Sequence, residues 1–274
     1  MKIRECLFIA ALLLSAVPSF GGIRYEFTET TRTEETGQGT HMVARAVIEG
    51  GMSRLDILSG NRYEPGSFIL SHGDNRIYMV NPAQKSYVEL ETGQRINPDR
   101  VTITDLKASF TEVPQAELAI IAGYPTRHYR LTLSYRIEVR MGTIPIRQHI
   151  DTTIEKWTTG AFDHVIEQYR SNVDELKTGN PEIDALIEAE STRFKGLALR
   201  ERTQIVSRSE KKSKGRNVNL PTSRKRTKDM VVSSIEEVAV SPNFFAIPVD
   251  YTGGQPTRPP GTTTQYLTMQ PDGP

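Results

Sequence analysis

The sequence is almost without cysteine, since Cys6 is the only one in 274 residues. A disulfide within the chain is therefore excluded. Cys6 also opens an apolar run, whereas a lipid-acylated cysteine would follow the end of such a run, so no lipid anchor is expected. If Cys6 leaves with an N-terminal signal, no thiol remains and a thiolate mechanism is excluded. The fold must then rest on its hydrophobic core.

No apolar run is long enough to cross a membrane as a helix. The longest, Leu7–Val17, follows Lys2 and Arg4 and ends at Pro-Ser-Phe-Gly-Gly, whereas a spanning helix needs about 20 apolar residues. This pattern is typical of a secretory signal peptide. Cleavage after Gly21 or after Ser19 fits, and we favour Gly21; an uncleaved anchor is the alternative. We expect a signal peptide at 1–21, no transmembrane segment in the mature chain, and a periplasmic or secreted protein.

The chain also lacks an excess of either charge. Without Lys2, Arg4 and Glu5, the 34 basic and 33 acidic side chains become 32 of each. A neutral balance argues against a general polyanion or polycation binder, and we expect no nucleic-acid partner.

Motifs for catalysis are missing as well. The five histidines are scattered, without His-Glu-x-x-His. His149 and Asp151 are spaced to share one face of a strand, but no third metal ligand is identifiable. Ser209-Glu-Lys-Lys212 matches Ser-x-x-Lys by chance, without its companion motifs. No nucleophile elbow, phosphate loop or dinucleotide fingerprint is found. We expect no enzyme activity, no metal and no cofactor.

What the sequence has in abundance is period-two alternation between turn clusters, which indicates strands half-buried on one face. From His128 to Met141, the odd positions are apolar or aromatic and the even positions polar. The stretch Asn-Pro-Ala-Gln-Lys at 81–85 is typical of a hairpin turn, so a meander is expected. The predicted strands are Ile23–Thr31, Met42–Glu49, Arg54–Leu58, Ser67–Ser71, Arg76–Val80, Ser86–Glu91, His128–Met141, Arg147–Trp157, Leu199–Glu210 and Met230–Val240.

Three segments have helical spacing: Pro114–Ile121, Phe162–Lys177 and Pro181–Phe194. The last has Asn180 as a candidate N-cap before Pro181. The segment 211–228 carries eight basic and no acidic residues and is predicted to be a mobile hairpin loop. The tail 252–274 is rich in Pro, Gly and Thr and is expected to be disordered.

Several stretches together resemble the DUF4412 type of uncharacterised exported bacterial proteins, which are thought to share the fold of the lipoprotein carrier LolA. They run in order along nearly the whole mature chain: Arg54-Leu-Asp, Arg76-Ile-Tyr-Met-Val-Asn-Pro, Lys85-Ser-Tyr87, Ala122-Gly-Tyr-Pro-Thr-Arg-His-Tyr129, Glu155-Lys-Trp157-Thr-Thr, Lys195-Gly-Leu and Phe245-Ala-Ile-Pro-Val-Asp-Tyr251. The basic segment 211–228 and the tail depart from this pattern.

The resemblance implies a mainly β (α+β) fold at residues 22–251. It would be a strongly curved antiparallel sheet, an incomplete barrel, with helices across its concave face and a Gly-Tyr turn leading into the longest strand. The final Phe-x-Ile-Pro strand would pin the last edge. In the lipid-carrier relatives the space between sheet and helices receives acyl chains. Fold alone does not transfer that function.

Two groups of residues are candidates for a site. The first is a set of apolar side chains that either line a ligand cavity or form an ordinary filled core, since both need the same residues: Tyr129, Leu131, Leu133, Tyr135, Ile137, Trp157, Leu186 and Phe194. The second is a set of basic residues that either contact an anionic surface or keep a loop solvated: Lys211, Lys212, Lys214, Arg216, Arg224, Lys225, Arg226 and Lys228.

The leading hypothesis is a non-enzymatic periplasmic binding protein that holds a lipid or lipidated peptide in an apolar cavity. The alternative is a protein-interaction or sensor module of the cell envelope, with a filled core and an envelope protein as partner. A continuous apolar cavity of at least ~300 Å³ would favour the first.

Overall fold

The computed structural model describes residues 21–72, 76–90, 101–141, 144–167, 184–185, 188, 193–209 and 223–254. The predicted signal peptide therefore lies outside the described residues, apart from Gly21. The elements in chain order are β1 (Gly22–Thr33), β2 (Gly39–Glu49), β3 (Met52–Gly60), β4 (Phe68–Ser71), β5 (Ile77–Asn81), β6 (Ser86–Leu90), β7 (Val101–Val113), β8 (Ala119–Ile121), β9 (Tyr124–Met141), β10 (Ile144–Thr159), β11 (Leu197–Ser209), β12 (Ser223–Val238), the 3₁₀ turn η1 (Pro242–Phe245) and β13 (Thr252–Gly253).

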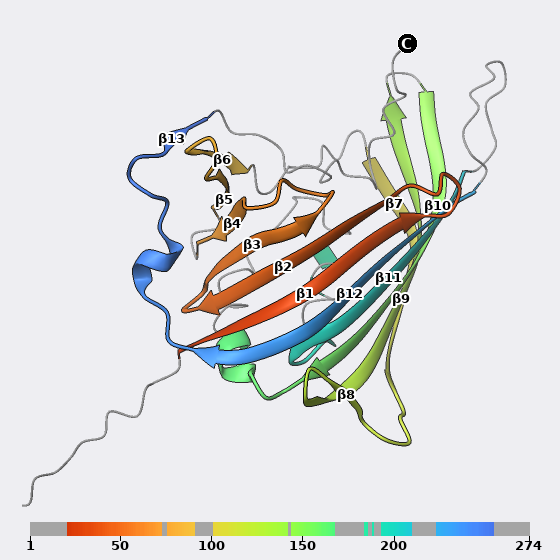
Figure 1. Cartoon of the computed structure of the whole chain (residues 1–274). Coiled ribbons are helices and arrows are strands. Elements are labelled where there is room, and N and C mark those ends of the chain that lie inside the picture. The colour runs from red at the N-terminus through yellow and green to blue at the C-terminus, as the bar shows by residue number, and fades with distance from the viewer. Residues whose placement is uncertain are drawn as a thin grey trace, which may run out of the picture.

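One large curved sheet contains these strands (Figure 1). Its order is β13-β6-β5-β4-β3-β2-β1-β12-β11-β10-β9-β7, and β8 pairs with β9 beside this path. All neighbours are antiparallel except β13 and β6. The order consists of two meanders, β1 to β6 and β9 to β12, joined where β1 pairs with β12. The predictions of a mainly β fold and of an open, curved antiparallel sheet are confirmed.

Each of the ten predicted strands is present, with ends that differ by a few residues. The hairpin at 81–85 is also present, and its geometry explains the sequence there. The backbone N–H of Gln84 donates to the side-chain oxygen of Asn81 at 3.1 Å. Lys85 takes a positive φ of 47°, and β5 then pairs antiparallel with β6.

The helix predicted at Pro114–Ile121 is wrong. Residues Ala119–Ile121 form the short strand β8, which folds back on Tyr124–Thr126. The turn between them places Ala122 and Gly123 at φ 49° and 87°, the left-handed pair of a tight hairpin turn. The Gly-Tyr turn into the longest strand is therefore present, and the apolar residues before it belong to a hairpin.

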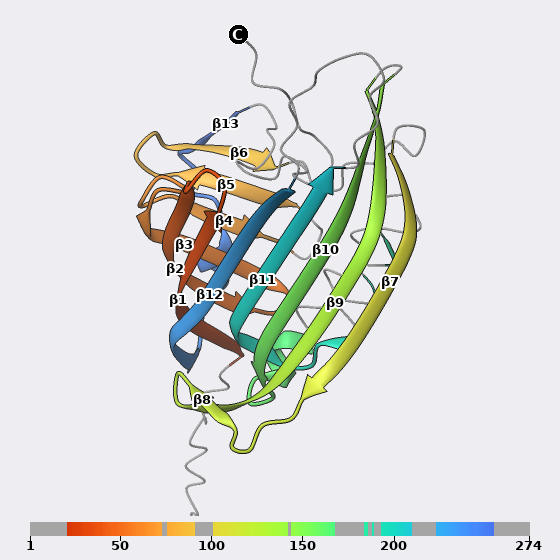
Figure 2. The ribbon, with the colours of Figure 1, turned by 90° about the vertical axis from the view of Figure 1, so that its right-hand side faces the viewer.

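Of the two other predicted helices, only parts are described. Residues 163–167 are helical and lie inside the curve of the sheet (Figure 2), whereas 168–177 lie outside the described residues. In the segment 181–194, residues 184, 185, 188 and 193 are helical and most others are not described. The expectation of helices across the concave face therefore stays a prediction, since the described part contains only the helical turn at 163–167 and four further helical positions.

Two boundaries differ from the prediction at the C-terminal side. Strand β12 begins at Ser223, because its residues pair with both β1 and β11, so 223–228 are strand and not loop. Residues 210–222 lie outside the described ranges. Thr252 and Gly253 pair with Ser86 and Tyr87 of β6, so the folded part reaches beyond residue 251, while 255–274 are not described.

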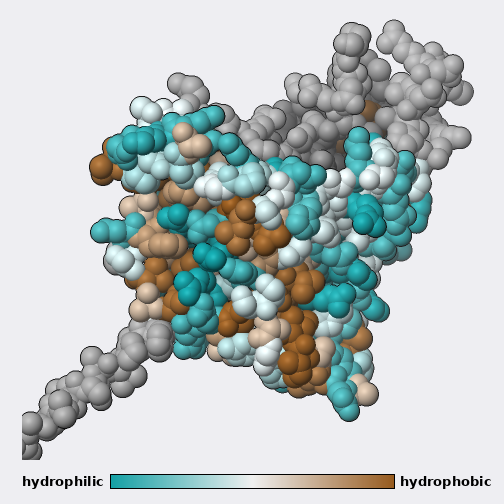
Figure 3. All heavy atoms as spheres, viewed as in Figure 1, coloured by the Kyte–Doolittle hydropathy of each residue, from teal (hydrophilic) through white to brown (hydrophobic). Residues whose placement is uncertain are grey.

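The buried side chains form clusters on both faces of the sheet. On the concave face, Phe162, Val165 and Ile166 of the helical turn pack against β1, β2, β11 and β12. On the outer face of β4 to β6, a separate cluster contains Phe68, Leu70, Tyr78 and Val80, and the C-terminal residues Ile247 and Tyr251 cover it. The prediction of a Phe-x-Ile-Pro strand at this edge is wrong: Phe245 ends η1, residues 246–251 contain no strand, and β6 is paired instead by Thr252 and Gly253 of β13. Figure 3 shows hydrophilic residues interspersed with smaller hydrophobic groups on one side of the molecule.

Candidate functional site

The concave wall of β9 has the alternation that the sequence predicts. Leu131, Leu133, Tyr135 and Ile137 are buried, with exposed fractions of 0%, 8%, 7% and 2%. Thr132 and Arg136 are exposed, and Ser134 is half-buried. In a strand, successive side chains point to opposite faces, so the odd positions of β9 lie on the concave face.

These side chains belong to two neighbouring apolar clusters. Tyr129, Leu131 and Leu133 pack with Ile154 of β10 and with Phe194, against Phe110 of β7. Tyr135 and Ile137 pack with Ile150 of β10 and with the start of β7. The structure therefore brings together six of the eight predicted cavity-lining residues, Tyr129, Leu131, Leu133, Tyr135, Ile137 and Phe194. Leu186 lies outside the described residues.

Trp157 does not belong to this wall, and the prediction that it lines the cavity is wrong. Its register partner on β9 is His128, whereas Lys156 pairs with Tyr129. Because neighbouring residues alternate between faces, Trp157 and His128 lie on the outer face. There the two rings stack with centroids 4.1 Å apart. The guanidinium of Arg200 lies 4.7 Å from the centre of the indole.

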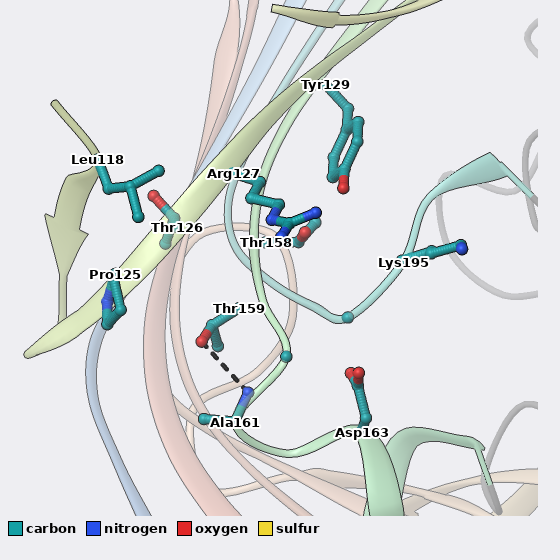
Figure 4. A pocket seen from close by; sticks show the side chains of 12 residues that line it. Leu118, Pro125, Thr126, Arg127, Tyr129, Thr158, Thr159, Ala161, Asp163 and Lys195 are labelled. Carbon is teal, nitrogen blue, oxygen red and sulfur yellow. Dashed lines mark hydrogen bonds between the residues drawn. The ribbon is translucent and has the colours of Figure 1, made fainter. Parts of the chain in front are cut away.

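A pocket of about 470 Å³ lies at the end of the concave wall, beside Tyr129 (Figure 4). Four segments form it: Leu118 before β8, the start of β9, the end of β10 with the turn that follows, and residues 195–196. Its lining residues are Leu118, Pro125, Thr126, Arg127, Tyr129, Thr158, Thr159, Gly160, Ala161, Asp163, Lys195 and Gly196. Of the predicted cavity residues, only Tyr129 is among them, and the lining is mixed in polarity.

Three polar side chains point into this pocket in Figure 4: those of Arg127, Thr158 and Asp163. Arg127 and Thr158 are register partners on β9 and β10. The guanidinium of Arg127 is 4.0 Å from the nearest carboxylate that pairs with it, that of Glu112. The side chain of Lys195 points away from the centre of the pocket (Figure 4).

Tyr129 connects the pocket to the apolar wall. Its phenol points into the pocket (Figure 4), and its ring stacks on Phe110 with centroids 5.5 Å apart. Phe194 meets both rings edge-on, at 5.5 Å from Phe110 and 6.3 Å from Tyr129. Tyr129 is therefore both a lining residue of the pocket and a member of the apolar cluster.

A row of alternating charges crosses the concave face next to this cluster. The ammonium of Lys228 on β12 is 2.7 Å from the carboxylate of Glu201 on β11. Lys156 on β10 is 3.6 Å from the same carboxylate, and its ammonium lies 4.4 Å from the centre of the Phe194 ring. Arg62 and Glu29 form a further ion pair, and the charge of Glu29 also acts on Lys228.

Both members of the central pair keep their charge despite burial. Burial alone would raise the pKa of Glu201, but Lys228 and Lys156 hold that pKa below its ordinary value. Burial would lower the pKa of Lys228, but Glu201 raises it above its ordinary value. Lys228, predicted as a surface contact, is therefore an ion-pair partner on the concave face.

The structure describes three of the other basic candidates, all on β12, and leaves four undescribed. Lys225 is paired with Glu34 at 2.6 Å. Arg224 is exposed and Arg226 is half-buried on β12. Lys211, Lys212, Lys214 and Arg216 lie outside the described residues. The residues of this group that the structure describes belong to a strand, and at least two are neutralised, so they do not form a free basic surface.

His149 and Asp151 do share one face of β10, as their spacing predicts. The Nε2 atom of His149 and the Oγ atom of Ser134 are 3.2 Å apart, and Nε2 is also 3.2 Å from Asp151. Ser134 donates to Asp151 at 2.8 Å. Because serine and carboxylate contact the same ring nitrogen, the three do not form a nucleophile–base relay. Within the described ranges, no three His, Cys, Asp or Glu residues gather as metal ligands would, and no helix there is long and apolar enough to cross a membrane.

Comparison with known proteins identifies no family for this chain. No family model matches it, and no curated protein matches it either. The resemblance to the DUF4412 type therefore remains a prediction.

Comparison with solved structures gives matches at very low identity. An uncharacterized conserved protein from Thermus thermophilus is 9% identical, with 84% of this chain and 90% of that one covered and a TM-score of 0.33. A DUF1329 family protein from Desulfovibrio piger is 10% identical, with 84% and 92% covered and a TM-score of 0.33. A domain assigned to outer membrane lipoprotein sorting, from Vibrio parahaemolyticus, is 9% identical, with 83% and 90% covered and a TM-score of 0.30.

Proposed function

We propose that this chain is a non-enzymatic binding protein of the cell envelope that takes an amphipathic ligand with an apolar chain, such as a lipid or a lipidated peptide. The observation that carries this proposal is the position of Tyr129. It lines the pocket and also stacks within the apolar cluster of Leu131 and Leu133. A ligand whose polar end occupies the pocket would direct its apolar chain along the concave wall.

The size of the pocket and the residues at its mouth support the proposal. A volume of about 470 Å³ lies within the range of roughly 300–1,000 Å³ for small-molecule pockets. Leu118, which lines the pocket, is 55% exposed, and Ile120 on β8 is 66% exposed. Exposed apolar side chains beside a pocket favour contact with an apolar ligand. Binding would gain about 25 cal/mol per Å² of apolar surface removed from water.

One observation favours the alternative, an envelope interaction module with a filled core. Leu131 and Ile137 are almost without exposed surface, at 0% and 2%, as they would be under side chains that fill the space. In that case the pocket would end at Tyr129, and the apolar wall would serve stability alone.

The replacement Leu133→Trp separates the two functions. We would measure binding of a fluorescent C18 fatty acid and the free energy of unfolding, with Thr132→Trp on the outer face as the matched control. If the wall receives the chain, Leu133→Trp weakens probe binding and leaves stability nearly unchanged. If the core is filled, the parent does not bind the probe and Leu133→Trp loses about 1–3 kcal/mol to overpacking. The second result would overturn the proposal.

A further inference from the structure

The pocket beside Tyr129 presents two opposite charges that do not neutralise each other. Arg127 enters it from β9 and Asp163 from the start of the helical turn (Figure 4). Among the residues that the structure describes, the Asp163 carboxylate forms no hydrogen bond and no ion pair. The cation of Arg127 is 4.0 Å from Glu112, the outer limit for an ion pair. Each charge is thus available to a ligand.

Thr158 supplies a neutral hydrogen-bonding group in the same pocket. Its residue is only 4% exposed, and its side chain is among those that line the pocket. Figure 4 shows this hydroxyl beside the end of the Arg127 side chain. A hydroxyl that lines the pocket beside a guanidinium can donate a hydrogen bond to an anionic group of a ligand.

From this arrangement we infer that the pocket binds a zwitterionic head group, with its anionic part at Arg127 and Thr158 and its ammonium at Asp163. The inference rests on the proposed function, since the apolar chain of the same ligand would leave the pocket past Tyr129. A guanidinium and a hydroxyl both donate to phosphate oxygens, and a carboxylate accepts from an ammonium group. A phosphoethanolamine head group carries a phosphate and an ammonium joined by a short linker, so it offers one charge to each of the two side chains.

The pocket should also discriminate against head groups of other charge. A purely anionic head group would satisfy Arg127 and Thr158, but it would leave the half-buried Asp163 unpaired and close to negative charge. A head group with only an ammonium would gain no hydrogen bond from Arg127, whose side chain is 68% exposed, or from Thr158. Because leaving a partly desolvated charge unpaired is unfavourable, the zwitterion is the head group that satisfies all three side chains.

Binding of two lysophospholipids with the same acyl chain tests this inference. We would measure the affinity of the full chain for lysophosphatidylethanolamine and for lysophosphatidylglycerol below their micellar concentrations, by native mass spectrometry and by titration calorimetry. We expect the ethanolamine lipid to bind at least about tenfold more tightly, which corresponds to one charged hydrogen bond.

Substitutions of Asp163 and Arg127 then test which charge of the head group each side chain binds. Asp163→Asn should weaken binding of the ethanolamine lipid about tenfold and leave the glycerol lipid unchanged or improved. Arg127→Gln should weaken both lipids. Arg130→Gln is the matched control, because it removes an arginine of β9 that is paired with Glu155 at 2.8 Å on the opposite face; it should change neither affinity.

The outcomes distinguish the inference from the proposed function. Equal affinity for the two lipids, with no effect of Asp163→Asn, would overturn the head-group assignment and leave lipid binding intact. Failure of both lipids to bind would overturn the proposed function. Binding of free phosphoethanolamine is the third measurement. If it binds as tightly as the lipid, the pocket serves a soluble zwitterion, and the assignment of a lipid head group to the pocket is wrong.

Discussion

The imidazole of His128 lies parallel to the indole of Trp157, with an angle of 6° between the rings and 4.1 Å between their centroids. The two residues are direct cross-strand partners of β9 and β10, and Arg200 covers the indole from β11. A large aromatic residue on the outer face is thereby shielded by its neighbours. The Nε2 atom of His128 is 3.4 Å from the carboxylate of Glu155.

Titration of His128 should make stability depend on pH. Burial lowers its pKa from the ordinary 6.5, while Glu155 acts in the opposite direction and Arg130 adds to the lowering. The folded state therefore favours the neutral ring, so its stabilising contribution is complete above pH 6.5 and is lost as the pH falls through the folded-state pKa. We expect the melting temperature to fall between pH 7 and 5, and to fall less in His128→Phe, which keeps the stack. Parallel profiles of the two proteins would contradict this.

The ion pair of Glu201 with Lys228 should matter far more than the surface pairs. Glu201→Gln removes the carboxylate that Lys228 and Lys156 share, which we expect to cost about 3 kcal/mol of unfolding free energy. The control Glu236→Gln breaks a pair with Arg24 whose side chains are 59% and 45% exposed, and it should cost less than about 1 kcal/mol. Urea unfolding measures the free energy of unfolding of both variants. Equal losses of stability would show that the ion pair of Glu201 and Lys228 is as well solvated as the surface pair.

The carboxylate of Glu201 should also make stability depend on pH, in a more acidic range than His128 does. Because Lys228 and Lys156 hold the pKa of Glu201 below its ordinary 4.5, its contribution is present above pH 4.5 and is lost as the pH falls through the lowered value. The wild type should therefore lose stability below pH 4.5 more steeply than Glu201→Gln. An identical slope in the two proteins would mean that another group controls acid unfolding.

Charge placed on the two faces of β9 should have unequal effects. Leu133→Arg puts a cation among side chains of the concave cluster, where Leu133 itself is 8% exposed, and it should cost several kcal/mol. Thr132→Arg changes an exposed residue and should stay within about 0.5 kcal/mol of the wild type. Thermal unfolding followed by circular dichroism compares them; similar losses would contradict the assignment of faces.

Gly196 should be irreplaceable in the wall of the pocket. Its φ is +81°, and a Cβ there would lie 2.5 Å from the backbone oxygen of Thr159. Gly66→Ala is the control, because Gly66 also has a positive φ, of +86°, but open space around its Cβ position. We expect the control to lose about 1–2 kcal/mol, and Gly196→Ala to lose more and to weaken lipid binding. Equal losses of stability in the two alanine variants, with lipid binding unchanged, would contradict this prediction.

The sequence predicts this fold well where one face of a strand is uniformly buried. Strand β9 is the clearest case, since its alternation holds from Tyr129 to Ile137. Strand β7 is not predicted from the sequence, because its alternation of buried and exposed residues is interrupted. Asp105 takes a positive φ of 57°, and the register with β9 shifts between Thr104 and Lys107, so the alternation changes phase in the middle of the strand.

The candidate site was harder to predict, because residue type alone does not give the face. Trp157 was assigned to the cavity as an aromatic residue, although counting in steps of two from Ile154 places Lys156 on the concave face and Trp157 on the outer one. Lys228 was assigned to a charged loop, and only the pairing of β12 with β11 reveals its contact with Glu201. Arg127, Thr158 and Asp163 come from separate segments without a shared motif, so no sequence signal joins them.

The pairing of β1 with β12 sets a condition on how the molecule is made. Gly22 lies opposite Val238 and Arg24 opposite Glu236, so the middle of the sheet joins residues more than two hundred positions apart. The meanders can close locally, but the ladder between them must wait for almost the whole polypeptide. Long-range pairing of this kind slows folding, and until β12 arrives, the inner edges of β1 and β11 are open to pairing with other chains. A chaperone or translocation machinery that holds the growing chain would therefore act on these two edges.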